Sequence, residues 1–494
     1  MFKVVRVLLL GGMVGKLLGV LRELIFAWLF GTGAVASAFR LAQSAFLIPL
    51  HGFVSESING AFTPKYSAQR ETEPHRAAAL FSGLYTVLLL ISIIVAIGLF
   101  VGADLWVAAL APGFDAERRQ VATAMLQVLA LALPAYVVSG LFASVDLAMG
   151  RGGLSASRAS IQSLGLILGT LAAMWLGKPN MIAVGFVTSF AVLFIIGRRV
   201  ILDEGLTLRL VWFLSPEIKS ALIEIFKAFR ILIWIPIAFQ INGIIERRVA
   251  SLVSEDAMVA VDYARFITET LIILVAMPFG LAGLSTMASM NVEAFRKAKI
   301  LAFRALLYVG IPLSALLYVN ANLIVAIIFE RGAFGSHSVD VTAQILSGMA
   351  IGIWGQLLGY AGAKFMSARG QNTGALIASL LGVAFSVTTL LFGQSSFGIS
   401  VLGAAAALQG LVFGSFILWR MEVFRELGLE IFSLILIAIS YVFSAEILIN
   451  FNQKNIWSSV SFAILFWAIF FIALPWHRRT AIEAISLIKN KNKI

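Results

Sequence analysis

The chain is divided into long apolar stretches, each bounded by charged residues or by proline and glycine. A helix rises about 1.5 Å per residue, so about 20 apolar residues cross the roughly 30 Å hydrocarbon core of a bilayer. We place fourteen such spans at residues 4–30, 33–63, 77–104, 120–148, 154–176, 179–200, 218–245, 256–288, 299–319, 337–366, 373–393, 399–420, 430–450 and 456–475. A shorter apolar stretch, Leu323 to Phe329, is predicted to be an interfacial helix. The expected fold is an all-α polytopic membrane protein with about fourteen transmembrane helices.

The amino-acid composition agrees with a chain whose surface faces lipid. Hydrophobic residues make up 60% of the 494 residues and charged residues only 13%, whereas a soluble domain carries about a quarter charged residues to wet its surface. The net charge is +12, but the positive residues lie in short loops between apolar stretches. That distribution is typical of topology signals in membrane proteins, so no nucleic-acid partner is expected.

The sequence contains no cluster of residues with the spacing of an enzyme or metal centre. It has no cysteine, which excludes disulfides, thiolate metal sites and a cysteine nucleophile. The histidines are scattered and lack metal-ligand spacing: His51, His75, His337 and His477. No P-loop pattern is present, and small-residue spacings such as Gly165 to Gly169 indicate close helix packing. We therefore expect a membrane protein that is not an enzyme and has no metal or organic cofactor.

Positive residues are distributed unevenly between alternate loops. With the N-terminus in the cytoplasm, the outside loops contain only Arg118, Arg119, Lys178, Arg331 and Lys454. The inside loops contain roughly four times as many, Arg151 and Arg158 among them. This bias predicts cytoplasmic termini and an even number of spans, with the first apolar stretch retained as a helix.

An internal repeat indicates how the spans are grouped. Arg22 precedes Arg40 by 18 residues, and Arg247 precedes Arg265 by the same distance. Each second arginine opens a long, proline-containing apolar stretch. Parallel repeats of about six helices predict two six-helix lobes related by a pseudo-twofold axis along the membrane normal, with a substrate path between them. The predicted division is an N-lobe at 1–200, a C-lobe at 201–425, and two C-terminal spans with a basic cytoplasmic tail at 426–494.

Charged residues within the predicted spans are few, and each costs several kcal/mol unless it faces water, a partner or a ligand. Four of the cations are interpreted as lining a functional cavity: Lys16, Arg22, Arg40 and Arg265. Converging cations would bind an anion, and the planar fork of arginine suits phosphate in particular. The ligand predicted from these residues is a strongly anionic lipid headgroup.

Other charged residues receive a structural interpretation. Four charged residues lie near predicted span ends, where their side chains are best explained as reaching the interface or as forming mutual salt bridges: Glu23, Glu246, Arg247 and Arg248. In the eighth span, Glu269 follows Arg265 by four positions, so the two side chains are able to pair along the helix.

Several short strings occur in a fixed order along the chain. GKLLGVLRE at 15–23 is followed by FGTG at 30–33. The later strings are NGAFTP at 59–64, APGF at 111–114, YAR at 263–265, FERGAF at 329–334 and SARGQNT at 367–373. In this order the chain resembles the MurJ/MviN family of lipid flippases, a branch of the multidrug/oligosaccharidyl-lipid/polysaccharide exporter superfamily.

The resemblance implies a flippase of the bacterial inner membrane that works by alternating access. Its cargo would be an undecaprenyl-pyrophosphate-linked saccharide, moved from the cytoplasmic to the outer leaflet with the membrane potential or a coupling ion. The family's essential cations fall on Lys16, Arg22 and Arg265, with pyrophosphate binding as their implied role. The resemblance also implies contact with membrane lipids, a groove in the last two spans for the polyprenyl tail, and glycan synthases or polymerases as partners.

In the second span the chain departs from the family pattern. Ser37 occupies the position of an acidic residue, and an Arg and a Glu of the family fall near Ser55 and Asn59. An alignment with a gap brings His51 and Glu56 to these positions instead. We therefore include Glu56 among the candidate substrate-binding residues.

In the second half of the chain, Thr268 replaces an acidic residue one turn after the eighth-span arginine, and the neighbouring Glu269 becomes a candidate in its place. The eleventh span has no carboxylate, so no sodium site is expected. These departures leave two cargoes open: the peptidoglycan precursor lipid II, and an exopolysaccharide or O-antigen repeat unit.

Two further functions remain as alternatives. A cation-coupled exporter of small amphipathic molecules would use the same scaffold, but it predicts an intramembrane carboxylate and no excess of arginine. A non-transporting scaffold that recruits synthases predicts that the loops, and not Lys16, Arg22 or Arg265, are essential.

Overall fold

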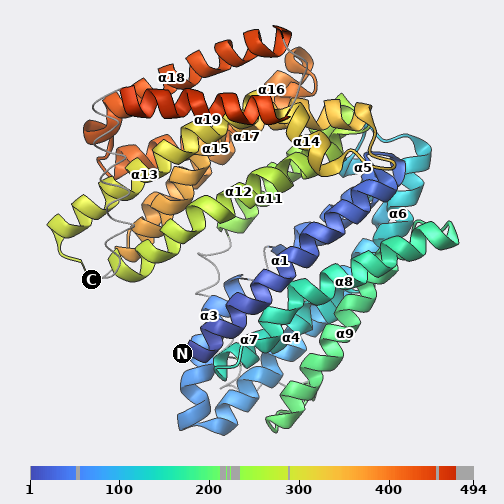
Figure 1. The fold of residues 1–494 in the computed structure, drawn as a ribbon. Helices are drawn as coiled ribbons and strands as arrows, with labels where there is room; N and C mark the ends of the chain where they lie inside the picture. The colour runs from blue at the N-terminus through green and yellow to red at the C-terminus, as the bar shows by residue number, and fades with distance from the viewer. Residues whose placement is uncertain are drawn as a thin grey trace. The chain divides into compact units, whose positions relative to one another are not determined.

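The computed structural model describes residues 2–51, 56–211, 219, 223, 234–287, 290–451 and 456–473. Across these ranges the chain forms helices joined by short turns, and they contain no strand. The helices separate into two compact units. Figure 1 colours the chain by residue number, from blue at the N-terminus to red at the C-terminus. Unit 1 contains Met1–Val259 and Arg331–Gly335, and unit 2 contains Ala260–Glu330 and Ser336–Ile494. The all-α fold class is confirmed, while the predicted three-part division stays a prediction.

Unit 1 is built around helices that are far apart in sequence. Its helices are α1 (Phe2–Phe30), α2 (Ala34–His51), α3 (Glu56–Thr72), α4 (Pro74–Val101), α5 (Ala103–Leu110), α6 (Ala116–Ala130), α7 (Leu133–Ala148), α8 (Gly153–Leu176), α9 (Met181–Asp203) and α11 (Trp234–Val253). Helix α1 packs on α8, and α2 on α6. The short segment Arg331–Gly335 belongs to this unit, and the Ala333 amide donates to the Trp28 carbonyl at 2.8 Å.

Unit 2 is centred on two long helices that pack along each other. Its helices are α12 (Ala257–Thr286), α13 (Val292–Val319), α14 (Ala321–Phe329), α15 (Ser336–Ala368), α16 (Asn372–Phe397), α17 (Ser400–Arg420), α18 (Phe424–Phe451) and α19 (Ile456–Ala473). Helix α15 packs on α17 and on α13, and α13 also contacts α18. The side chains of Arg304 in α13 and Glu430 in α18 form an ion pair of 2.7 Å, in which Glu430 is only 3% exposed.

Eight of the described helices are long and apolar enough to cross a membrane. The number rises to nine if α6 and α7, which meet at 46°, form one bent span. Large apolar side chains are exposed on these units, among them Trp175 at 87% and Val101 at 80%, as expected for faces that contact lipid. The other five predicted spans fall on α1, on α2 with α3, in part on α11, on α12 and on α19. Of the predicted span 218–245, residues 218–233 lie outside the described part of the chain, apart from 219 and 223. The count of fourteen is therefore consistent with the structure.

The helix boundaries differ from the prediction in two places, and the first is the short helix α5, which was not predicted. The predicted span 33–63 falls on α2 and α3, and residues 52–55 between them lie outside the described residues. The predicted span 120–148 is bent, because Pro134 in the first turn of α7 cannot donate the backbone hydrogen bond that would continue α6. The short helix predicted from Leu323 to Phe329 is confirmed as α14.

Close helix packing through small residues, predicted from the Gly165 to Gly169 spacing, is confirmed. A side-chain carbon at Gly185 of α9 would overlap the Gly165 carbonyl of α8 and lie 2.8 Å from the Gly169 α-carbon. Backbones that approach this closely gain dispersion contacts along the whole crossing. Glycine is therefore required at this α8–α9 crossing.

The Gly185→Val variant is expected to lose most of its folded protein. Its branched side chain would push α8 away from α9, and overpacking of this kind costs about 1–3 kcal/mol or more. Membrane abundance and the thermal unfolding midpoint in detergent measure the effect. Gly98→Val is the matched control, because a side-chain carbon there meets nothing within 4 Å. Equal behaviour of the two variants would contradict the packing argument.

Candidate anion-binding site

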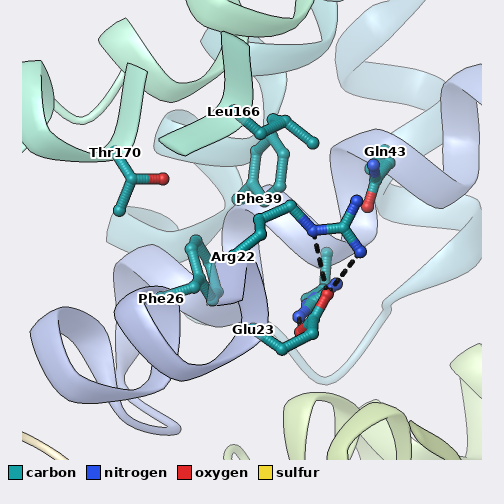
Figure 2. Close-up of a pocket in the computed structure, with 8 residues that line it drawn as sticks. Arg22, Glu23, Phe26, Phe39, Gln43, Leu166 and Thr170 are labelled. Carbon is teal, nitrogen blue, oxygen red and sulfur yellow. Dashed lines mark hydrogen bonds and ion pairs between the residues drawn. The ribbon is translucent and has the colours of Figure 1, made fainter. Parts of the chain in front are cut away.

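Helices α1 and α2 bring two arginines to one carboxylate. Arg22 and Glu23 are consecutive in α1, and Arg40 comes from α2. The Arg22 Nη2 and Nε atoms donate to Glu23 Oε1 at 2.6 and 3.2 Å. The Arg40 Nη2 atom donates to the other carboxylate oxygen, Oε2. Figure 2 shows the Arg22 side chain directed at the Glu23 carboxylate, and the same carboxylate also pairs with Arg40.

The cluster is largely removed from solvent. The side chain of Glu23 is 6% exposed, that of Arg40 12% and that of Arg22 25%. The Arg40 guanidinium also lies 5.0 Å from the ring centroid of Phe26. Two guanidinium groups therefore share the Glu23 carboxylate in a setting of low dielectric constant, where interactions between charges are strong.

The cluster lines a small pocket. Its other walls are Phe26, Phe39 and Gln43 from α1 and α2, and Leu166 and Thr170 from α8. The volume is about 10 Å³, which is room for about one water molecule. A pyrophosphate is much larger, so its entry would require the two arginines to turn away from Glu23. In the observed arrangement the Glu23 carboxylate accepts hydrogen bonds from both arginines.

Two other predicted cations lie outside this cluster. Lys16 is exposed on α1, six residues before Arg22, which is about 9 Å along the helix axis. Arg265 belongs to unit 2, in α12, where it is half-buried; Glu269 follows one turn later and is exposed. The hydroxyl of the intervening Thr268 donates to the Arg265 carbonyl at 3.1 Å, so the Thr268 hydroxyl is hydrogen-bonded within its own helix.

The second-span candidates fall at the edge of the described part of the chain. Glu56 is the first residue of α3 and His51 the last of α2. Their side chains, and that of Asn59, lie outside the described part, as does the whole of Ser55. Glu56 therefore stays a prediction.

Ser37 explains one of the departures from the family pattern. This residue is fully buried, and its hydroxyl lies 3.3 Å from the carbonyl oxygens of both Thr32 and Glu255. A hydroxyl donates to such oxygens, whereas a carboxylate would be repelled by both. The surroundings of Ser37 are therefore suited to a neutral donor.

The residues near predicted span ends make structural contacts. Arg247 donates from Nη1 to the Met258 carbonyl at 3.0 Å, and Arg248 donates to the Ala109 carbonyl at 3.1 Å. Glu23 also makes the mutual salt bridges expected of it. The prediction missed that these salt bridges place Glu23 at the centre of the candidate site. The adjacent Arg22 was a signal for this, but the approach of Arg40 depends on how α1 and α2 pack.

The described side chains include no group of three or more His, Asp or Glu residues that could hold a metal ion. The polar chemistry of the cluster is that of an oxyanion receptor: two planar forks that donate in-plane hydrogen bonds, next to aromatic rings.

Comparison with known proteins identifies chains that are similar to this one. The family model of the lipid II flippase MurJ matches residues 26–473. A probable lipid II flippase MurJ of Rhizobium meliloti (strain 1021) is 26% identical over 465 residues, which cover 84% of this chain and 80% of the relative. A probable lipid II flippase MurJ of Synechocystis is 28% identical over 378 residues, 69% of this chain and 66% of the relative.

Solved structures show the same fold. A lipid II flippase MurJ in an inward closed conformation matches with a TM-score of 0.79 and 18% identity, over 93% of this chain and 97% of that one. A multidrug resistance transporter of the MATE family, in an inward-facing conformation, matches with a TM-score of 0.66 and 14% identity, over 82% and 95%. At these identities the matches establish the fold alone.

Proposed function

The chain belongs to the lipid II flippase MurJ family, and we propose that it moves lipid II, an undecaprenyl-pyrophosphate-linked saccharide, from the cytoplasmic to the outer leaflet of the inner membrane. The family is one of multi-pass transporters and not of enzymes. Lipid II is preferred over an exopolysaccharide or O-antigen repeat unit, because lipid II is the substrate in the names of the family model and of the relatives.

The observation that supports this proposal is the buried cluster of Arg22, Glu23 and Arg40. A pyrophosphate carries several oxyanion edges, and each arginine fork matches one of them. The carboxylate of Glu23 pairs with both arginines. Exchange of Glu23 for pyrophosphate would break two ion pairs and form at least two, so binding and release would both be possible without a deep energy minimum.

The remaining predicted residues complete the proposal. Lys16, which is exposed on α1, and Arg265 in unit 2 would contact the pyrophosphate at other stages of an alternating-access cycle. Glu56 and Glu269 would contact the polar part of the headgroup. The polyprenyl tail would stay in lipid, in a groove formed by the last two helices. Cytoplasmic termini, drive by the membrane potential or a coupling ion, and association with glycan synthases or polymerases are part of the same proposal.

The test is mass spectrometry of undecaprenyl-linked precursors after depletion of the protein in its own host. Accumulation of lipid II with loss of cell shape and lysis supports the proposal. Accumulation of a different polyprenyl-linked oligosaccharide in growing cells would assign the protein to polysaccharide export instead. If no polyprenyl intermediate rises, the flippase function is wrong, and a cation-coupled exporter of small amphipathic molecules becomes the leading function.

A further inference from the structure

Arg158 is a cation within unit 1 that the proposed function does not use. The sequence places Arg158 among the predicted cytoplasmic loop charges. In the structure it lies inside α8, five residues after Gly153 at the start of the helix. Its guanidinium carbon lies 4.5 Å from the ring centroid of Tyr136 in α7 and 5.6 Å from that of Phe190 in α9. Three helices therefore contribute to the surroundings of this one charge.

The hydrogen-bonding capacity of Arg158 is not satisfied. Its Nη2 atom is buried and has no hydrogen-bond partner, and no ion pair to this side chain is found in the described part of the chain. A guanidinium stays protonated under all ordinary conditions. A charged donor without a partner inside a helix bundle costs several kcal/mol unless a water molecule or an anion accepts its hydrogen bond.

A second stacked arginine shows what a satisfied arrangement looks like. In unit 2 the Arg369 guanidinium lies 4.3 Å from the ring centroid of Phe295, and its Nη2 atom donates to the Met290 carbonyl at 2.9 Å. Both arginines use an aromatic ring for the flat face of the guanidinium. Of the two, only Arg369 has a protein acceptor for its Nη2 N–H group.

Arg158 lies apart from the cluster around Arg22. Gly165 and Gly169, which meet α9, follow Arg158 by seven and eleven positions and therefore share its face of α8. Leu166, which lines the space beside Arg22, follows by eight positions. Eight residues at 1.5 Å each amount to about 12 Å along the axis, and they turn through about 80°.

Stacking on a ring satisfies the face of a guanidinium and leaves its in-plane N–H groups free. These groups form a fork that matches two oxygens of one phosphate or carboxylate group. We propose that Arg158, stacked on Tyr136 and Phe190, is a second oxyanion site in unit 1 that binds a phosphate group. At a membrane surface that group comes from a soluble phosphate compound or from a phospholipid, and both present the same edge of oxygens.

The test uses the full-length protein in detergent, in phosphate-free buffer at constant ionic strength. Equilibrium dialysis with radiolabelled inorganic pyrophosphate compares wild type with Arg158→Gln, Arg158→Lys, Arg22→Gln and Arg369→Gln. In Arg158→Gln the bidentate, charge-assisted contact is lost. The affinity for pyrophosphate at the site formed by Arg158 is therefore expected to fall roughly tenfold or more. Arg158→Lys keeps the charge without the fork and is expected to be intermediate. Arg22→Gln is expected to retain the sites that depend on Arg158, and Arg369→Gln is expected to match wild type.

Mass spectrometry of co-purified phospholipids separates the two sources of phosphate. If wild type retains a phospholipid that Arg158→Gln loses, and binds pyrophosphate at this site only after delipidation, the natural ligand is a lipid phosphate. If no lipid differs, a soluble phosphate compound is the ligand. Thermal unfolding midpoints without ligand identify any variant that fails to fold, in which case Arg158→Lys decides. Pyrophosphate binding and retained lipids that are the same in Arg158→Gln, Arg158→Lys and wild type would overturn the proposal. That result would leave the flippase function untouched, since transport is measured separately.

Discussion

Replacing Arg22 by alanine is expected to abolish translocation of the lipid-linked saccharide while the protein still inserts at near-normal abundance. Arg22 is the most exposed member of its cluster, at 25%, so its removal costs little folding free energy but takes away one of two phosphate-binding forks. Arg265→Ala in α12 is expected to have the same effect. Complementation of a depleted strain measures function, and immunoblotting of membranes measures abundance.

Two variants control for this result. Arg22→Lys keeps the charge but loses the planar fork, so partial activity is expected. Arg119→Ala is a matched arginine variant, because Arg119 pairs with Asp104 on the surface at 2.6 Å and is expected to complement fully. Normal function of both Arg22→Ala and Arg265→Ala would rule out the cationic site.

Replacing Glu23 by glutamine is expected to destabilise the folded protein by about 3–5 kcal/mol, the usual cost of removing one partner of a buried ion pair. The carboxylate accepts from both Arg22 and Arg40 and is only 6% exposed. Without its charge, two guanidinium groups would repel each other in a space with room for about one water. The thermal unfolding midpoint in detergent measures the loss.

The size of this effect separates a buried ion pair from a surface one. Glu426→Gln removes a partner of Arg296 in an exposed pair, 40% and 58% exposed, which is expected to contribute little to stability because solvent screens it. Glu23→Gln combined with Arg40→Gln removes one of the repelling charges and is expected to recover part of the stability. An unfolding midpoint for Glu23→Gln equal to that of Glu426→Gln would contradict the role of Glu23 as counter-ion.

Most helices could be predicted from the sequence, because each must be apolar over a length set by the bilayer. The short helix α14 was found in the same way. The bend between α6 and α7 was not found, although Pro134 marks its position, because proline is also tolerated within continuous membrane helices. Helix α5 was missed because its apolar residues follow those of α4 after a single glycine, Gly102.

The candidate site was predicted in part. Arg22 and Arg40 stood out because charge inside an apolar stretch is costly, but only tertiary packing brings them to one carboxylate. Salt bridges were predicted correctly for Glu23. The sequence did not show that they place Glu23 between the two arginines of the candidate site. For Arg158 the sequence favoured a loop charge near a helix start, and the rings of Tyr136 and Phe190 come from helices whose packing no local pattern encodes.

If this chain carries lipid II across the membrane, its activity determines how much lipid II is exposed on the outer face of the membrane in cells. Spheroplasts of the depleted host, with and without the wild-type chain or its Arg22→Ala variant, would be treated with an impermeant enzyme that cleaves the pyrophosphate linkage. We expect lipid II to be cleaved when the wild-type chain is present, and to be protected when the chain is absent or carries Arg22→Ala. Equal cleavage in all three would contradict transport of lipid II by this chain.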